Sequence, residues 1–249
     1  MSAPAPEHTT ATSPWLTTHL AAFDAETTGP DPATARIVSW GRWNIDMRLG
    51  RPIHSGWLLD PGVDIPQEVT DIHGITTAHA REHGQAAATG IREIAADLLH
   101  WVSEGAVAVA FNAVYDLTLL RAECLRHGYT DLAHQLTTIS PVADPFVLDK
   151  VITPRRSGKG CRKLTAVADI YQVPLGEDAH GSKADALAAA RVLYKMMSAS
   201  PRLAAMNPAQ LHQAQIGWFA QQQADMEAYF TSIGRAEGRS FDPAWPIRA

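Results

Sequence analysis

The chain is poor in cysteine, has no long apolar run and carries no excess of positive charge. Its two cysteines, Cys124 and Cys161, match no metal-ligand spacing, which favours free thiols in a reducing compartment. No window approaches the length of a membrane-spanning helix. The formal net charge of −5 argues against sequence-independent binding of nucleic acid over a broad basic face, but it is compatible with a local basic groove.

The first fourteen residues are rich in Ala, Pro, Ser and Thr and lack a basic segment followed by an apolar core. We therefore expect a flexible tail over residues 1–14 instead of a signal peptide, and a cytoplasmic protein. The 249-residue length and the 46% hydrophobic content are typical of a soluble globular protein with a substantial core. We expect one α/β domain over residues 15–200 and a helical extension over residues 201–249.

Five apolar stretches predict the strands of one mixed sheet. The first three are joined by short turns, which favours an antiparallel meander, because parallel pairing needs longer crossovers. The other two alternate with segments of helical periodicity. The predicted strands are 19–25, 36–43, 52–59, 106–111 and 139–143, and the first two predicted helices are 85–102 and 112–127. This order predicts a three-layer α/β domain with a mixed five-stranded sheet flanked by helices.

Three more helices are predicted in the second half of the chain, over residues 162–171, 182–197 and 207–234. The last begins at Asn207-Pro208 and repeats apolar side chains at helical intervals: Leu211, Trp218, Phe219, Met226, Tyr229, Phe230 and Ile233. We interpret this stripe as a packing surface, either for the domain or for a partner, and expect 241–249 to lie against it. Within the segment 67–77, residues 71–76, with His73 beside Gly74, are predicted to form a loop.

The stretch Phe23-Asp24-Ala25-Glu26-Thr27-Thr28-Gly29 ends the first predicted strand with two carboxylates. Side chains alternate along a strand, so Asp24 and Glu26 point to one side and Phe23 to the other, packed side. Two like charges this close raise one pKa unless a cation neutralises them, and oxygen ligands suit Mg²⁺ or Mn²⁺. A strand end that runs into a polar turn is the alternative interpretation.

A loop at 151–163 holds a local concentration of positive charge. Its basic residues are Arg155, Arg156, Lys159, Arg162 and Lys163. Arg and Lys in a glycine-containing loop can close on a polyanion, so phosphate binding is one interpretation of this loop. A solvated loop is the other.

Three further polar residues stand at strand ends or helix starts. Asp116 follows the 106–111 strand, and His180 precedes Asp185 by five positions. Ser182 and Asp185 also fit a capping box, and His180 fits a plain loop residue, so structural roles are alternatives for both. With the pair on the first strand, the four carboxylates could hold two divalent cations about 3.5–4 Å apart, an arrangement suited to phosphodiester hydrolysis.

Together these motifs resemble the DEDD 3′–5′ exonucleases of the histidine subtype (DEDDh), a DnaQ-like family, over about residues 20–197. Phe-Asp-Ala-Glu-Thr-Thr-Gly is similar to the first motif, Phe-Asn-Ala-Val-Tyr-Asp at 111–116 to the second, and His180 with Asp185 to the third. The His-Gly-Ile-Thr segment at 73–76 is similar to a loop that borders the substrate groove of the family. Pro30 stands where family members often have Leu or Met.

The resemblance implies a ribonuclease H-like fold and a site for two Mg²⁺ or Mn²⁺ ions. The implied metal ligands are Asp24, Glu26, Asp116 and Asp185. The resemblance also makes His180 the general base, since an imidazole with a pKa near neutrality can take a proton from the attacking water. The expected substrate-binding residues are Thr27, Thr28 and His73, together with Arg155, Arg156 and Lys159 of the basic loop.

We therefore predict a metal-dependent 3′–5′ exonuclease, with single-stranded DNA as the expected substrate. The alternatives are an RNA 3′ exonuclease of the oligoribonuclease type, hydrolysis of small nucleotides, and a module that binds a polymerase or repair partner through the helix over 208–234. The 2′-hydroxyl separates RNA from DNA, and no residue in the sequence is identifiable as its partner. No pattern fixes the oligomeric state.

Overall fold

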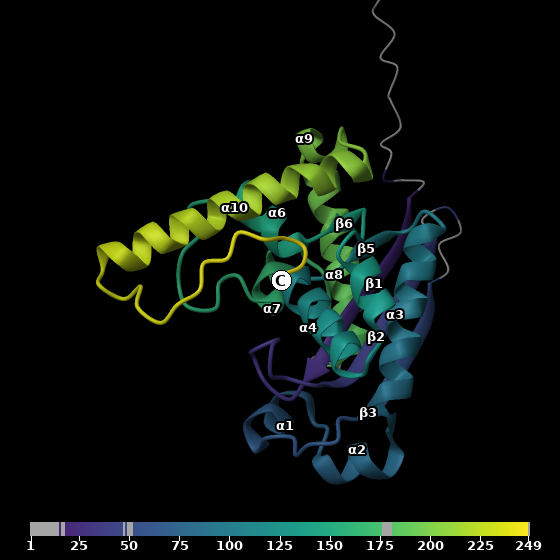
Figure 1. The fold of residues 1–249 in the computed structure, drawn as a ribbon. Helices are drawn as coiled ribbons and strands as arrows, with labels where there is room; N and C mark the ends of the chain where they lie inside the picture. Colours follow the sequence, from purple (N-terminus) through teal and green to yellow (C-terminus); the bar gives the residue numbers. More distant parts are fainter. Residues whose placement is uncertain (1–14, 16–17, 47, 49–51, 176–180, 249) are drawn as a thin grey trace, which may run out of the picture.

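The computed structural model describes residues 15, 18–46, 48, 52–175 and 181–248. A mixed sheet with helices on both faces forms its centre, and a long C-terminal helix crosses one end of the sheet (Figure 1). The strands are β1 (His19–Thr27), β2 (Ile37–Asp46), β3 (Ile53–Asp60), β4 (Gln85–Ala86), β5 (Val107–Val109) and β6 (Val142–Ala143). The helices are α1 (Gln67–His73), α2 (Thr77–His83), α3 (Ala87–Ser103), α4 (Ala113–Arg126), α5 (Thr130–Leu136), α6 (Pro145–Ile152), α7 (Leu164–Ile170), α8 (Ser182–Ala199), α9 (Pro201–Ala204) and α10 (Pro208–Ser232).

The strand order within the described residues is β4-β3-β2-β1-β5-β6. β1, β2 and β3 pair antiparallel, which confirms the predicted meander, and β5 and β6 continue the sheet in parallel with β1. The predicted count of five strands is wrong by one, because β4 adds a short parallel pairing with β3. Two residues are too few to show the alternation from which a strand is read.

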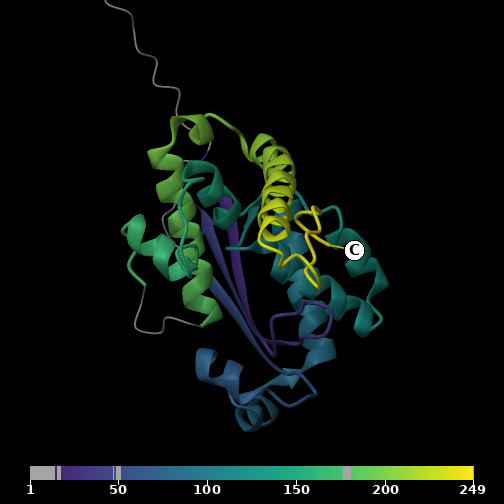
Figure 2. The same ribbon diagram turned by 90° about the vertical axis from the view of Figure 1, so that its left-hand side faces the viewer.

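Both faces of β1 are covered, and Figure 2 shows the sheet between two helical layers. Phe23 packs into the core cluster that includes side chains of α3 and α4, while Leu20 and Ala22 pack with side chains of α8. Asp24 and Glu26 continue the alternation of Leu20 and Ala22. Both carboxylates are therefore on the face of β1 that α8 covers.

The prediction of a loop over 71–76 is wrong for its first three residues, because they form the end of α1. The helix ends at Gly74, whose left-handed backbone (φ 76°) lets its N–H donate to the Thr70 carbonyl at 2.7 Å. No residue of α1 is buried, so the apolar stripe that reveals a helix in a sequence is missing. α5 and α6 are likewise short and were not predicted, and β5 and β6 are shorter than the stretches expected over 106–111 and 139–143.

The structure agrees with the expectation of free thiols. Cys124 is buried, Cys161 is half-buried, and both are free thiols. None of the described helices combines the length and the apolar content that crossing a membrane requires.

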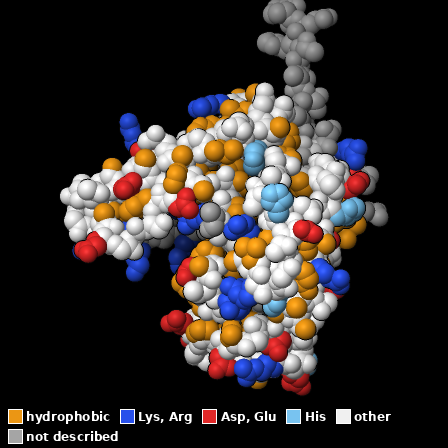
Figure 3. Space-filling model, viewed as in Figure 1, with side chains coloured by type: hydrophobic (Ala, Val, Ile, Leu, Met, Phe, Trp, Pro, Cys, Tyr) orange, Lys and Arg blue, Asp and Glu red, His pale blue; other side chains and the backbone are white. Residues whose placement is uncertain are grey.

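Helix α10 begins as predicted, with a capping box between Asn207 and Gln210. The part of the helix up to Gln223 is docked on the domain through every fourth residue: Leu211, Gln215, Phe219 and Gln223. The predicted apolar stripe is therefore only partly the packing face, and Tyr229 and Ile233 near the end of the helix are 60% and 42% exposed. Figures 1 and 3 show this far half extending beyond the body of the molecule.

Side chains of α10 also cover β6, the edge strand of the sheet. The amide of Gln215 donates to the Val142 carbonyl at 2.9 Å and accepts from the Asp144 N–H at 2.7 Å. His212 Nδ1 accepts from the Val142 N–H at 3.1 Å. An edge strand leaves such backbone groups open to pairing with another chain, and α10 occupies them here. Trp245 of the C-terminal segment is also buried, against the ring of His212.

Candidate active site

Three carboxylates meet at the carboxyl end of β1. Oxygen atoms of Asp24, Glu26 and Asp185 all lie within 4.8 Å of one another, and each residue is half-buried. The first two come from β1, and Asp185 comes from the first turn of α8. The structure thus brings together three of the four predicted metal ligands from residues far apart in the chain.

Gly41 of β2 lets the start of α8 come this close. A Cβ on Gly41 would lie 2.6 Å from the backbone nitrogen of Lys183 and 2.8 Å from the carbonyl oxygen of Ser182, so any side chain there would push the helix away. The hydroxyl of Ser182 lies 3.0 Å from that of Ser39. The predicted capping box is wrong, because Gly181 is the N-cap residue and no side chain caps this helix.

The fourth predicted ligand, Asp116, is in the first turn of α4 and is 4% exposed. Its Oδ1 accepts a hydrogen bond from the Ala25 N–H at 3.1 Å, between the two carboxylates of β1. Asp116 is not part of the group of oxygens within 4.8 Å of one another. It is close enough for its charge to act on the pKa of Asp24.

Asp144 fixes the start of α4 and so the position of Asp116, a role that sequence reasoning missed. Its fully buried carboxylate accepts from the N–H groups of Asn112 (2.9 Å) and Ala113 (3.0 Å), and from Phe146 (2.9 Å) as the N-cap of α6. Asn112 takes a left-handed conformation, with φ 70°. Asp followed by Pro is a helix-start pattern and was the available signal.

Burial and mutual repulsion raise the pKa values of the carboxyl groups. Desolvation, and then the charges of Asp116, Glu26 and Asp185, raise the pKa of Asp24 well above its ordinary value. Desolvation followed by the charges of Asp185 and Asp116 raises the pKa of Glu26 to about 8. The pKa of Asp116 also rises to about 8, mainly through desolvation, although backbone N–H groups oppose the shift.

This donor set fits a divalent cation. Within the described residues, no Lys or Arg forms an ion pair with Asp24 or Glu26, so no protein cation neutralises either carboxylate. Hard cations such as Mg²⁺ and Mn²⁺ prefer oxygen ligands, and a bound cation would hold the carboxyl groups ionised.

A cavity of about 620 Å³ opens beside Glu26, between the end of β1 and α1. Thr27, His73 and Tyr115 line it. Nδ1 of His73 accepts from the Ile75 N–H at 3.1 Å, so the neutral ring carries its proton on Nε2. Burial lowers the pKa of His73, and the Thr27 carbonyl partly opposes this shift.

Thr28 faces β2. Its hydroxyl accepts from the Arg36 N–H at 2.9 Å, and its own N–H donates to the Arg36 carbonyl at 3.0 Å. These bonds hold the turn after the carboxylates. Pro30, where the family pattern differs, lines the 620 Å³ cavity and is exposed.

Two arginines of the basic loop form ion pairs within the fold. Arg156 and Arg162 form ion pairs with the fully buried Asp149, at 3.0 and 2.6 Å, so the guanidinium predicted to bind phosphate at Arg156 already has a carboxylate partner. Arg155 and Lys159 are exposed and form no ion pair within the described ranges.

One basic residue absent from the predicted contacts lies closer to the carboxylates. Lys163 lines a cavity of about 400 Å³ together with Asp71 and Asp185. Two cavities thus adjoin the carboxylate cluster, one lined by Glu26 and one by Asp185, and Ile72 lines both. His180, the predicted general base, lies outside the described residues.

Comparison with known proteins adds independent information. Residues 21–193 match the model of the family RNase T, described as exonuclease. A DNA polymerase III subunit epsilon-like protein of Rhodobacter capsulatus is 31% identical over 187 residues, which are 71% of this chain and 23% of that protein. A DNA polymerase III of the PolC type from Lacticaseibacillus paracasei is 26% identical over 185 residues, covering 74% of this chain and 12% of its own length. The chain therefore spans a quarter or less of these curated relatives.

Solved structures of exonuclease I are similar in fold. The E. coli enzyme in complex with a dT13 oligonucleotide has a TM-score of 0.60 at 17% identity, over 75% of this chain and 42% of that one. Exonuclease I of Methylocaldum szegediense has a TM-score of 0.59 at 22% identity, with the same coverage. The likeness supports the predicted ribonuclease H-like three-layer fold.

Proposed function

The chain belongs to the RNase T exonuclease family, and from this premise we propose that it is a divalent-metal-dependent exonuclease that removes nucleotides from 3′ ends. The observation that carries the proposal is the cluster of Asp24, Glu26 and Asp185 oxygens within 4.8 Å, at the carboxyl end of a central strand. The pKa values of Asp24 and Glu26 are raised, and neither residue pairs with a Lys or Arg among the described residues, which suits bound cations.

We assign Asp24, Glu26, Asp116 and Asp185 as ligands of two Mg²⁺ or Mn²⁺ ions. When bound, such ions stabilise the charge that develops on the phosphoryl oxygens. His180 would accept the proton of the attacking water. The bond from phosphorus to the 3′ oxygen of the preceding nucleotide breaks, so the product is a nucleoside 5′-monophosphate and the shortened strand ends in a 3′-hydroxyl.

For the substrate we propose single-stranded DNA. The cavity beside Glu26 has room for the terminal nucleotide, and Lys163, which lines a cavity with Asp185, would contact a backbone phosphate. The E. coli exonuclease I of similar fold is described in complex with a dT13 oligonucleotide. RNA is the alternative, because both nucleic acids present the same phosphodiester.

A polymerase or repair partner is a further part of the proposal. Both curated relatives carry polymerase III names and are several times longer than this chain. The far half of α10, with Tyr229 and Ile233 exposed, is the surface we assign to such a partner.

The test is digestion of end-labelled single-stranded DNA, duplex DNA and RNA, in parallel with Mg²⁺, Mn²⁺ and EDTA. We expect mononucleotide release from 3′ ends, loss of activity in EDTA, and loss of activity in Asp24→Asn and Asp185→Asn variants. Asp225→Asn removes an exposed carboxylate of α10 and is the matched control. Activity that persists in both site variants would refute the proposal, and a wild-type rate in His180→Gln would refute the assigned base.

A further inference from the structure

A cavity lies away from the carboxylates, at the opposite end of β1 and β2. Leu20 and Ile45, which pair across these strands, line it together with Tyr194 and Lys195 near the end of α8. Glu26 is six positions after Leu20, which is about 20 Å of extended strand. The cavity is therefore distinct from the candidate active site, although α8 borders both.

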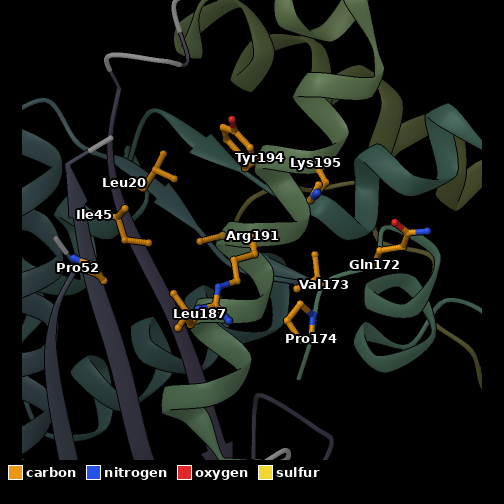
Figure 4. A pocket seen from close by; sticks show the side chains of 11 residues that line it. Leu20, Ile45, Pro52, Gln172, Val173, Pro174, Leu187, Arg191, Tyr194 and Lys195 are labelled. Atoms are coloured by element: carbon orange, nitrogen blue, oxygen red, sulfur yellow. The ribbon is translucent and has the colours of Figure 1, made fainter. Parts of the chain in front are cut away.

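The cavity has the size and the apolar floor of a small-molecule site. Its volume of about 370 Å³ falls within the range of roughly 300–1,000 Å³ that is typical of such sites. Figure 4 shows Leu20, Ile45 and Pro52 on one side of α8 and Val173 and Pro174 on the other. Leu20 and Val173 are buried, so a ligand would meet apolar side chains of the core.

The polar groups around this floor favour an anion. Arg191 and Lys195 are exposed. In the part of the chain that the structure describes, neither has an ion pair or a hydrogen bond, and no Asp or Glu lines the cavity. Two unpaired cations in a chain of net charge −5 make this a local site of positive potential. The side chain of Gln172 and the 43% exposed Tyr194 add hydrogen-bonding groups on the same lining.

We propose that this cavity binds a nucleoside 5′-monophosphate, and the choice of ligand rests on the proposed function, which releases that product. Each part of such a molecule has a counterpart here. Arg191 and Lys195 suit the phosphate, since a guanidinium matches phosphate oxygens in a fork geometry. The apolar floor suits the base, and the amide of Gln172 can both donate to and accept from a base edge.

The test is titration calorimetry with the Asp24→Asn variant of the 249-residue chain in EDTA, conditions in which the carboxylate cluster cannot hold a nucleotide through a metal ion. The probes are dAMP, dTMP, inorganic phosphate and decanoate. We expect saturable binding of the nucleotides, and binding at least about tenfold weaker for phosphate, which lacks the base, and for decanoate, which lacks the phosphate.

Variants locate the binding. Arg191→Ala should weaken nucleotide binding about tenfold, whereas Arg92→Ala, an exposed arginine of α3, should leave it unchanged. Gln172→Asn keeps a residue type that tolerates the left-handed backbone (φ 54°) and should reduce the difference between dAMP and dTMP.

Three results would overturn the inference: no saturable nucleotide heat, unchanged binding in Arg191→Ala, or decanoate binding as tightly as dAMP. If the wild-type protein digests DNA but the Asp24→Asn protein binds no nucleotide, the inference alone is refuted. If the Asp24→Asn protein binds dAMP but the wild-type protein digests no nucleic acid, the proposed function alone is refuted.

Discussion

The phenol oxygen of Tyr115 lies 2.9 Å from the hydroxyl of Thr27, and its O–H donates to the carbonyl of Gly29. The Thr27 hydroxyl has one proton, which it donates either to the Tyr115 oxygen or to the Gly29 carbonyl, 3.0 Å away. These bonds join the residue before Asp116 to the turn after Glu26, so they fix the first and second acidic motifs relative to each other. Desolvation raises the pKa of Tyr115 to about 12, so the phenol stays a donor at neutral pH.

The first prediction is that Tyr115→Phe lowers kcat more than it changes KM. Phenylalanine keeps the ring and removes only the hydroxyl, and the lost hydrogen bonds are worth about 0.5–1.5 kcal/mol each, or roughly two- to tenfold in rate. Steady-state kinetics on single-stranded DNA, beside thermal unfolding, is the measurement. An unchanged kcat would show that packing of the ring alone positions the turn.

Gly41→Ala is expected to separate Asp185 from the carboxylates of β1. The added Cβ meets backbone atoms of Ser182 and Lys183, which cannot rotate away as a side chain could, so overpacking should cost about 1–3 kcal/mol of stability. Activity should fall together with metal affinity, measured by calorimetry. Gly217→Ala, at a helical position with open space around it, is the control and should be neutral or stabilising. Unchanged metal affinity in Gly41→Ala would contradict this account.

The raised carboxyl pKa values predict how stability depends on pH without metal. Glu26 has a pKa of about 8 in the folded chain and an ordinary pKa of 4.5 in the unfolded chain, so the folded chain binds its proton more tightly. The free energy of unfolding should therefore fall as pH rises toward about 8. Mg²⁺ or Mn²⁺ should restore the stability and release protons on binding. Thermal unfolding in EDTA and with metal across this range measures the effect, and Glu26→Gln should flatten the EDTA curve. A stability in EDTA that rises over the same range would contradict the assignment.

Lys163→Ala should change DNA binding, whereas Arg156→Ala should change stability. Loss of a phosphate contact at Lys163 should weaken binding of DNA and reduce the salt slope by about one. Arg156 is already paired with the buried Asp149, so its loss should lower stability by about 1–3 kcal/mol and leave the salt slope unchanged. Fluorescence anisotropy at several salt concentrations separates the two. If the effects are exchanged, the basic loop and not the edge of the site binds the backbone.

Much of this fold and site could be predicted from the sequence because its signals are local. The alternation in β1 gives the shared orientation of Asp24 and Glu26, and the turns give the meander. Gly41 could not be predicted as a site residue, because its importance depends on α8 lying against β2. The hydrogen bonds of Gln215 are equally hidden, since a polar residue on a helix is ordinarily solvent-facing.

Gln215→Ala is expected to lower stability by about 1–3 kcal/mol, because it leaves the Asp144 N–H and the Val142 carbonyl buried without this partner. Gln213→Ala, exposed on the same helix, is the matched control. Activity should also fall, since Asp144 holds the start of the helix that carries Asp116.

A chain truncated after Ser200 should be poorly soluble, because the β6 edge loses its cover. Full solubility and activity of the truncated chain would show instead that α10 serves only a partner.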